Sequence, residues 1–469
     1  MTPNSQSATR CARRAQRFDT RVKRNAHVEC DTHVKRNAHV SLDTCGKFDA
    51  KGDSVSVSTA SDVTYADIVA ARARIDGGII RTSCQESAAL SELCGATIFC
   101  KTEYLQRTGS FKERGARNAL LLLDQTTRER GVIAASAGNH ALALAYHGRE
   151  LGISITVVMP NGAPLVKQTR CHAFGAKVVL HGKNIAEAKV KADEIAAAEK
   201  LTYIHGFNDA AIIAGAGTIG LEIIEQVDNI DAIVVPVGGA GLIAGLAIAV
   251  KEKNPRVKVI GVEPERCPSL HNALQAGRPV DAWHGSTLAD GLAVPQVGDR
   301  AFALARDRVD EVVTVREEHI ALAILRMLEL QKGVVEGAGA IGLAAFLAGK
   351  FNSLHGQRVA IVLCGGNIDP MMLTRVIERG VVLDHRMAQF TVVISDRPGG
   401  LAELAATIAH AGASVKQIEH DRTFGGADVS TVMVKCTLEV RDGEHLEQLR
   451  NALVSKGIRI LSHSKPLQD

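Results

Sequence analysis

Short apolar runs alternate with longer alanine- and leucine-rich runs from about residue 63 to residue 380. The apolar runs are rich in β-branched residues, and they read GVIAAS, ITVVMP, AKVVLHG, IDAIVVPVG, KVIGVEP and RVAIVLCGG. Runs of this length between helical patterns are typical of βαβ units. The pattern therefore predicts an α/β fold with open parallel sheets, and we expect ligands outside the carboxyl ends of the strands.

The pattern changes at both ends of this region. After Asp384 the chain reads as strand, turn, helix and strand, then as the strand DVSTVMVKCTLEV and the helix GEHLEQLRNALVSKG. This predicts a separate small α+β domain over residues 386–469. Residues 1–60 have no helical or strand period long enough to bury a face, so we expect a disordered basic extension there.

Composition excludes several classes of function. The chain has 469 residues, of which 46% are hydrophobic and 23% charged, as expected of a soluble globular protein. No apolar run reaches the roughly 18 residues of a membrane span. Of the formal net charge of +4, residues 1–60 carry +5, from eleven Lys and Arg against six Asp and Glu. The remainder is close to neutral and offers no basic face for nucleic acid.

Cysteine usage bears on the compartment. The ten cysteines form no C-x-x-C pair and have no regular spacing, which argues against a disulfide framework or a zinc cage. We therefore expect a reducing compartment and a cytoplasmic protein. The start of the chain, with its Arg and Ser residues, also allows a mitochondrial transit peptide, but Asp19, Glu29 and Asp31 weigh against it.

Lys112 follows Gly-Ser-Phe and opens the helical run KERGARNALLLL. The positive end of the helix macrodipole disfavours a cation there, so the pKa of the amine should be lowered. A lysine with a lowered pKa suits a nucleophile that must form an imine with a carbonyl group. The alternative is a solvated lysine with no chemical role.

Two small-residue loops follow predicted strands. In SAGNH, Ser136 to His140, backbone N–H groups and polar side chains can converge on an anion such as a carboxylate. The same residues also fit a helix capped by Ser or Asn, and the two interpretations are compatible. In VGGAGLIAG, Val237 to Gly245, the glycines let the backbone wrap a phosphate. No Walker lysine follows, so a phosphate monoester fits better than a nucleoside triphosphate.

Two further features are weaker. Gly215-x-Gly217-x-x-Gly220 matches the dinucleotide pattern, but no clean strand precedes it, which argues against dinucleotide binding. Cys364 ends the run RVAIVLC and is followed by two glycines. A buried cysteine is usually a small hydrophobic residue, yet its position at the carboxyl end of a strand makes it a candidate cofactor contact.

Together these motifs resemble the fold-type II pyridoxal-phosphate enzymes of the serine/threonine dehydratase family over roughly Val63 to Gly380. The similar segments are LQRTGSFKERGA, SAGNHA, GGAGL, VEGAGA and CGGN, in that order. The C-terminal unit resembles an ACT regulatory domain through DRPGGL, Asp396 to Leu401. The resemblance implies a catalytic domain over residues 61–382, with a smaller subdomain of about 95–215 inserted in the larger one.

The resemblance also implies roles for particular residues. Lys112 would bind pyridoxal 5'-phosphate covalently and act as the catalytic base, Phe111 would pack beside the ring, and Asn139 would hydrogen-bond its 3-hydroxyl. The implied phosphate loop consists of Gly238, Gly239, Ala240, Gly241 and Leu242, and the implied substrate-carboxylate loop of Ser136, Ala137, Gly138, Asn139 and His140. Cys364 would meet the pyridine nitrogen, where the family commonly has serine.

The implied reaction is the β-elimination of L-threonine to 2-oxobutanoate and ammonia, with L-serine giving pyruvate. Because a thiol supplies no fixed negative charge to the pyridine nitrogen, Cys364 favours elimination over transamination. Ala137 stands where related serine racemases have a serine that acts as the second acid, so racemisation is the less favoured alternative. A catalytically silent amino-acid sensor is another.

Other expectations from the resemblance are less specific. We expect a homo-oligomer and an amino-acid effector at the ACT domain, and no nucleic acid or membrane partner. Glu263 matches a carboxylate through which related enzymes bind a divalent cation, and Cys267 offers a carbonyl, but Ser269 replaces the expected acid. No metal ligand is therefore predicted. Glu336 is interpreted either as a residue near the cofactor or as a buried structural acid.

Overall fold

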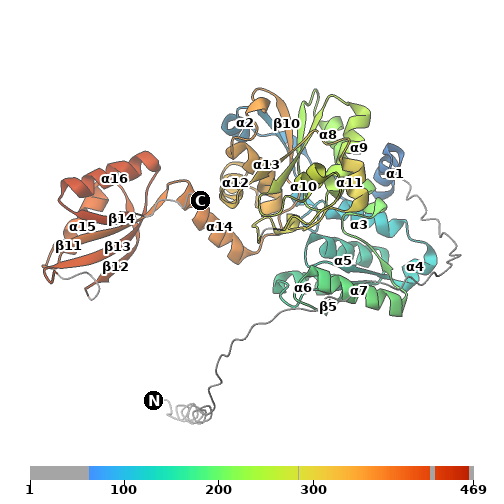
Figure 1. Cartoon of the computed structure of the whole chain (residues 1–469), viewed down its shortest axis with the longest axis horizontal. Helices are drawn as coiled ribbons and strands as arrows, with labels where there is room; N and C mark the ends of the chain where they lie inside the picture. The colour runs from blue at the N-terminus through green and yellow to red at the C-terminus, as the bar shows by residue number, and fades with distance from the viewer. Residues whose placement is uncertain (1–62, 284, 423–427, 464–469) are drawn as a thin grey trace, which may run out of the picture. The chain divides into compact units, whose positions relative to one another are not determined.

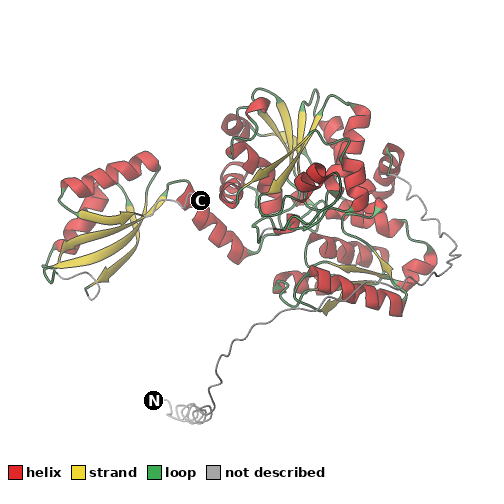
Figure 2. Ribbon diagram, viewed as in Figure 1, coloured by secondary structure: helices red, strands yellow, loops and turns green. Residues whose placement is uncertain are grey.

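The computed structural model describes residues 63–283, 285–422 and 428–463, so the extension predicted at residues 1–60 lies outside the described residues. Within them the chain forms a six-stranded sheet, a four-stranded parallel sheet and a four-stranded antiparallel sheet. Helices cover the sheets (Figures 1 and 2). These features confirm the predicted fold class, two open parallel-type sheets plus a small α+β unit.

The larger sheet has the strand order β1-β2-β10-β7-β8-β9. Its strands are β1 (Cys84–Glu86), β2 (Thr97–Lys101), β7 (Ala232–Pro236), β8 (Lys258–Pro264), β9 (Glu311–Val315) and β10 (Arg358–Val362). All neighbours are parallel except β1, which pairs antiparallel with β2. This edge strand departs from a purely parallel sheet. It arises because the short α2 turns the chain straight back, without the crossover that a parallel pair needs.

Helices cover both faces of the larger sheet: α8 and α9 lie on one side and α12 and α13 on the other (Figure 1). The α-helices of this region are α1 (Tyr65–Ile75), α2 (Ala88–Cys94), α8 (Ala210–Gln226), α9 (Gly241–Lys253), α10 (Ser269–Ala276), α11 (Asp299–Ala305), α12 (Glu317–Arg326), α13 (Gly337–Leu347) and α14 (Pro370–Leu383). Short 3₁₀ and π turns are η1 (Glu103–Leu105), η2 (Asp290–Leu292), η3 (Met327–Gln331) and η4 (Asn352–Leu354). Strands β7 and β10 are almost wholly buried, as expected of strands covered on both faces.

The smaller sheet has the order β5-β4-β3-β6 and is parallel throughout. Its strands are β3 (Val132–Ala135), β4 (Ile155–Met159), β5 (Lys177–Leu180) and β6 (Thr202–Tyr203). The accompanying helices are α3 (Lys112–Leu121), α4 (Gln125–Arg130), α5 (Asn139–Leu151), α6 (Leu165–Ala173) and α7 (Ile185–Glu199). Strand β2 belongs to the larger sheet, although the smaller subdomain was predicted to begin near residue 95. The exact domain bounds stay a prediction.

The third sheet has the order β12-β13-β11-β14 and is antiparallel. Its strands are β11 (Met387–Ser395), β12 (Ser414–Asp421), β13 (Thr431–Glu439) and β14 (Arg459–His463), with helices α15 (Gly400–His410) and α16 (Gly443–Ser455). Alternate residues of β11 and β13 are buried, because only one face of the sheet is covered by helices. This unit has its own hydrophobic core.

The pattern Gly215-x-Gly217-x-x-Gly220 lies inside α8, where no dinucleotide loop is formed. A Cβ added at Gly215 would lie 2.6 Å from the carbonyl oxygen of Arg114, in α3. At Gly217 and Gly220 it would lie 2.7 and 2.9 Å from backbone oxygens of α9. These glycines therefore allow close contact between helices.

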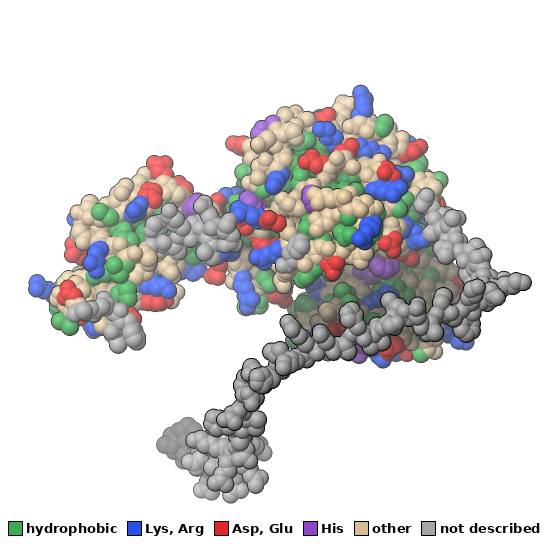
Figure 3. Space-filling model, in the orientation of Figure 1, with side chains coloured by type: hydrophobic (Ala, Val, Ile, Leu, Met, Phe, Trp, Pro, Cys, Tyr) green, Lys and Arg blue, Asp and Glu red, His purple; other side chains and the backbone are tan. Residues whose placement is uncertain are grey.

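The surface agrees with the charge count. On the face shown in Figure 3, Lys and Arg side chains are interspersed with Asp and Glu over the region of the two parallel sheets. In the part of the chain that the structure describes, no helix is both long enough and apolar enough to cross a membrane.

Candidate active site

Helix α3 begins at Lys112, as predicted, and its start is attached to the end of β10. Ser110 forms an isolated antiparallel bridge with Gly365, and the Phe111 N–H donates to the carbonyl of Cys364 at 3.0 Å. Segments that are far apart in the sequence are thus joined at the carboxyl end of a central strand. Lys112, Phe111 and Cys364 come together in this way.

The side chain of Lys112 is partly buried, and its amine is held by the main chain. Its Nζ donates to the carbonyl oxygen of Gly206 at 2.7 Å and lies 5.0 Å from the centre of the Phe111 ring. Burial lowers the pKa of Lys112 to about 8, although the nearby Cys364 and Glu336 oppose the shift. The predicted direction is therefore right, but burial is the main cause in the structure, whereas the sequence argument used the helix dipole.

The glycine loop after β7 is pressed against its neighbours. A Cβ at Gly239 would lie 2.2 Å from the ring of Phe207, and one at Gly241 would lie 2.3 Å from the Phe207 carbonyl oxygen. Ala240 adopts a left-handed conformation, with φ of 66°, as the N-cap of α9. A larger side chain at Gly239 or Gly241 would displace the loop.

The loop is oriented so that its carbonyls bind protein groups. The carbonyl of Gly238 accepts from Ser269 Oγ at 3.2 Å, and that of Gly239 accepts from the Gly298 N–H at 3.3 Å. The N–H groups of the loop and of the first turn of α9, which contains Leu242, are then the ones available to an anion. Such a helix start is a common phosphate site.

Residues 206 and 207 lie between the amine of Lys112 and the glycine loop. Gly206 accepts the hydrogen bond from Lys112, and the next residue, Phe207, contacts Gly239 and Gly241. The nitrogen predicted to bind an aldehyde and the loop predicted to bind a phosphate therefore lie on either side of one short segment.

The segment from Ser136 to His140 contains the link from β3 to α5 and the first two residues of α5. The N-cap of α5 is Gly138, and no side chain caps the helix, so the interpretation of Ser or Asn as its cap is wrong. Instead, Ser136 Oγ accepts from the Gly138 N–H at 3.3 Å. Residues 136–139, including Ala137, are partly exposed. An uncapped helix start with accessible N–H groups suits the predicted carboxylate site.

His140 is buried, and its ring points into the protein. Its Nε2 lies 3.1 Å from the carbonyl oxygen of Ile204, and Gly206 packs against the ring. Burial and the nearby Lys112 lower its pKa to about 3. The imidazole is therefore neutral, and its backbone N–H is the better candidate for a contact with substrate.

Asn139 is held by two residues of the opposite side of the site. Its Nδ2 donates to Glu336 Oε1 at 2.7 Å, and its Oδ1 accepts from Asn367 Nδ2 at 2.8 Å. Burial raises the pKa of Glu336 to about 7. Burial also raises the pKa of Cys364 well above its usual range, so this residue stays a neutral thiol. Of the two interpretations of Glu336, the structure favours the one that places it in the site.

Glu263 lies in the end of β8 and is fully buried. Its carboxylate accepts from the N–H groups of Leu270 and His271 at 2.7 and 2.9 Å, and from Ser269 Oγ at 3.3 Å. The thiol of Cys267 donates to the carbonyl oxygen of Val294 at 3.2 Å. Among the described residues, no group of three or more His, Cys, Asp or Glu side chains could hold a metal ion.

Sequence reasoning missed several residues of this site. Asn367 stands in the quoted CGGN motif, so the signal was available, but no role was assigned to it. Gly206, Phe207 and Arg170 belong to no motif with a chemical signature. Only the fold brings them beside Lys112, the glycine loop and Asn367.

The residues present fit pyridoxal phosphate. The cofactor needs a desolvated amine for its aldehyde, a tight N–H-rich loop for its phosphate and a neutral partner for its pyridine nitrogen. Lys112, the Gly238–Leu242 loop and Cys364 have these properties, and the amide of Asn139 can donate to the ring hydroxyl. The individual roles stay predictions.

Comparisons with known proteins identify two domains in this chain. The sequence profile of the pyridoxal-phosphate dependent enzymes matches residues 75–365, and that of the ACT domain matches residues 385–456. The chain is 44% identical to an L-threonine ammonia-lyase of Thermotoga maritima over 400 residues, which are 85% of this chain and 99% of that protein.

Two solved structures are similar to the catalytic region. Threonine deaminase isoform 2 of Solanum lycopersicum has a TM-score of 0.63 and 36% identity, over 67% of this chain and 92% of that one. Serine racemase of Dictyostelium discoideum has a TM-score of 0.62 and 36% identity, over 66% and 99%. The chain therefore belongs to the family of fold-type II pyridoxal-phosphate-dependent enzymes and carries a C-terminal ACT domain.

Proposed function

We propose that this enzyme converts L-threonine to 2-oxobutanoate and ammonia, and L-serine to pyruvate and ammonia. The observation that carries the proposal is the amine of Lys112, which is desolvated and separated from the glycine loop only by residues 206 and 207. Relatives that share 40–44% of their residues with this chain are named L-threonine ammonia-lyase or L-threonine dehydratase. Threonine is placed first for that reason.

The chemistry divides between the cofactor and the chain. Pyridoxal phosphate, when bound, stabilises the negative charge that develops at the Cα of the substrate. Because its pKa is lowered to about 8, Lys112 is partly uncharged near neutral pH and can remove the Cα proton. The loop 136–140 and the start of α5 hold the substrate carboxylate. The β-hydroxyl then leaves as water, and one water is consumed when the 2-oxo acid and ammonia are released.

Two residues favour elimination over other outcomes. Cys364 stays a neutral thiol and supplies no negative charge beside the pyridine nitrogen. Ala137 packs its methyl group against the core of the smaller sheet and offers no proton to the face opposite Lys112. A racemase needs such a donor. The likeness to a serine racemase structure makes racemisation the second candidate, and conversion of L-serine to D-serine is its test.

The proposal is tested with the purified full-length enzyme, by measuring the release of ammonia and 2-oxo acid from L-threonine and L-serine. Lys112→Ala should lower turnover by at least about a hundredfold, since it removes the base. Lys177→Ala, at an exposed ion pair with Glu199, is the matched control and should leave turnover unchanged. Equal turnover in both variants would exclude Lys112 as the base. Binding of threonine without product would indicate the silent sensor.

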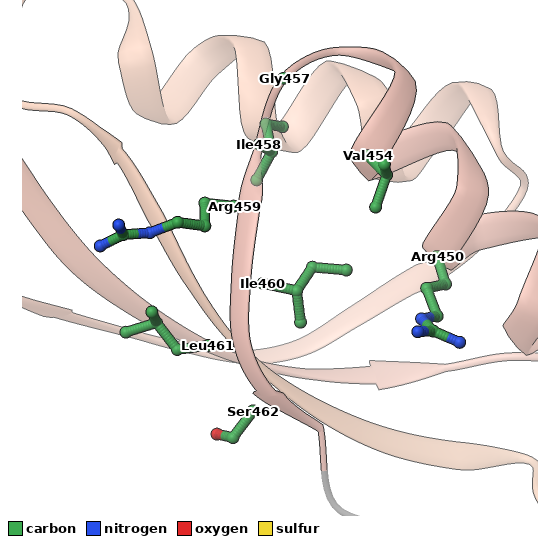
Figure 4. Close-up of a pocket in the computed structure, with 8 residues that line it drawn as sticks. All are labelled: Arg450, Val454, Gly457, Ile458, Arg459, Ile460, Leu461 and Ser462. Carbon is green, nitrogen blue, oxygen red and sulfur yellow. The ribbon is translucent and has the colours of Figure 1, made fainter.

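We also propose that the ACT domain binds an amino-acid effector and that the enzyme is a homo-oligomer. The ACT domain has a surface pocket between α16 and the edge strand β14 (Figure 4). The pocket is lined by Arg450, Val454, Gly457, Ile458, Arg459, Ile460, Leu461 and Ser462. Ile460 points to one side of β14, whereas Arg459 and Leu461 point to the other. Turnover measured with each of the common amino acids added, and sedimentation velocity, test these two points.

A further inference from the structure

Four polar side chains form a continuous row beside Lys112. Arg170 Nη1 donates to Asn367 Oδ1 at 2.7 Å, and Asn367 Nδ2 donates to Asn139 Oδ1 at 2.8 Å. Asn139 Nδ2 then donates to Glu336 Oε1 at 2.7 Å. The row therefore begins at a cation, passes through two amides and ends at a buried carboxyl group.

The contacts of Asn367 determine which groups donate and which accept along this row. An arginine side chain can only donate, so the oxygen of the Asn367 amide must face Arg170. Asn367 Nδ2 also donates to the carbonyl oxygen of Thr108 at 2.7 Å, and a carbonyl can only accept. Both contacts require the same orientation of Asn367. Because Asn367 turns its nitrogen to Asn139, the amide of Asn139 must present its oxygen to Asn367 and its nitrogen to Glu336.

This orientation leaves a defined group for a ligand. The Asn139 amide nitrogen carries two N–H groups, of which Glu336 uses one. The second remains for the ring oxygen of the cofactor, which is the contact predicted from the resemblance. If the amide were turned by 180°, its nitrogen would face the nitrogen of Asn367, so two donors would meet, and its second N–H would no longer face the ligand.

We propose that Arg170 and Asn367 are positioning residues, which hold the amide of Asn139 with an N–H toward the ring oxygen of pyridoxal phosphate. The proposal rests on the proposed function only in that the site binds this cofactor. The row also joins the two sheets. Arg170 and Asn139 lie on α6 and α5, which pack with the smaller sheet, whereas Asn367 and Glu336 adjoin β10 and α13 of the larger one.

The experiment measures dissociation constants of the apoenzyme for pyridoxal phosphate and for 3-deoxypyridoxal phosphate, which lacks the ring hydroxyl. Each variant is compared with the wild-type enzyme for each compound separately, so intrinsic differences between the two compounds cancel. Asn367→Asp keeps the shape of the residue and its contact with Arg170 but replaces the donor with an acceptor. It should weaken binding of pyridoxal phosphate by about three- to tenfold, as expected for one lost hydrogen bond. Binding of the deoxy compound should stay the same.

Arg170→Met removes the cation at the start of the row and should give a smaller change of the same selectivity. Thr169→Ala is the matched control, because Thr169 precedes Arg170 on the same helix and is exposed. It should not discriminate between the two compounds. If Asn367→Asp and Arg170→Met weaken both compounds equally, the row only fastens the two sheets and the proposal is wrong.

The test of the positioning role can fail independently of the test of the proposed function. A wild-type enzyme that binds pyridoxal phosphate but releases no 2-oxo acid would refute the proposed function and leave the positioning role open to confirmation by the same titrations. An active enzyme in which Asn367→Asp binds both compounds as the wild type does would refute the positioning role alone.

Discussion

Replacing Arg114 with methionine should destabilise the enzyme by about 3 to 5 kcal/mol, because it leaves an uncompensated charge in the core. Arg114 lies two residues after Lys112 in the sequence, and its guanidinium is fully buried. The guanidinium has five N–H groups and makes five hydrogen bonds. Nε and Nη2 donate to Glu103, each at 2.8 Å. Nη1 and Nη2 donate to Glu222 at 2.6 and 2.8 Å, and Nη1 also donates to Thr218 at 3.1 Å.

The magnitude follows from the charge balance of this cluster. Lys101 pairs with Glu222 at 2.5 Å, so two buried cations face two buried carboxylates. Removing the cation of Arg114 leaves one ammonium against two carboxylates that burial keeps away from water. Arg306→Met is the matched control, since its ion pair with Asp307 is exposed and should contribute at most about 1 kcal/mol.

The assay is urea unfolding of the holoenzyme, followed by circular dichroism, with the change in midpoint compared between the two methionine variants. A double variant tests the reasoning directly. Adding Glu222→Gln to Arg114→Met restores the balance between Lys101 and Glu103, so the double variant should lose less stability than the sum of the two single losses. A cost for Arg114→Met that equals that of Arg306→Met, or strictly additive losses, would refute the explanation from charge balance.

Three further changes have defined outcomes. Burial raises the pKa of Glu263 from 4.5 to about 7, so the contribution of Glu263 to stability is full below about pH 4.5 and is lost as the pH rises through about 7. The loss of stability should be roughly 3 kcal/mol at most, and it should be absent in Glu263→Gln when unfolding is measured between pH 4 and 8. Gly239→Ala places a Cβ against the Phe207 ring and should lower the free energy of unfolding by about 1 to 3 kcal/mol and weaken cofactor binding. Gly162→Ala, which has open space around it, should change neither quantity when unfolding curves and cofactor titrations are compared. Ala137→Ser should raise the formation of D-serine from L-serine; chromatography on a chiral column that finds no gain would count against a missing acid as the reason for weak racemisation.

The local part of the fold could be predicted from the sequence, and the contacts between distant segments could not. The alternation of apolar runs predicted the parallel strands, and the start of α3 at Lys112 was predicted from the change of composition there. Strand β1 pairs antiparallel because of a short return, which periodicity does not reveal.

The same division holds for the site. Loops with a chemical signature, such as SAGNH and VGGAGLIAG, were recognised as candidates. The partners of Asn139 could not be, because Glu336 and Asn367 lie 197 and 228 residues further along the chain. Nor does the sequence reveal that Gly138, which has no side chain, is the N-cap of α5. Polar residues at such distances leave no periodic signal, and only the packing of the two sheets brings them together.

The glycines of α8 have a consequence for the geometry of the candidate site. Gly215 lies against the backbone of α3, and Gly217 and Gly220 lie against the backbone of α9. Lys112 is the first residue of α3, and the glycine loop that was predicted to bind phosphate leads into the first residue of α9. Because main chain meets main chain on both sides, no rotamer can adjust the spacing. Helix α8 therefore fixes the distance between Lys112 at the start of α3 and the glycine loop at the start of α9.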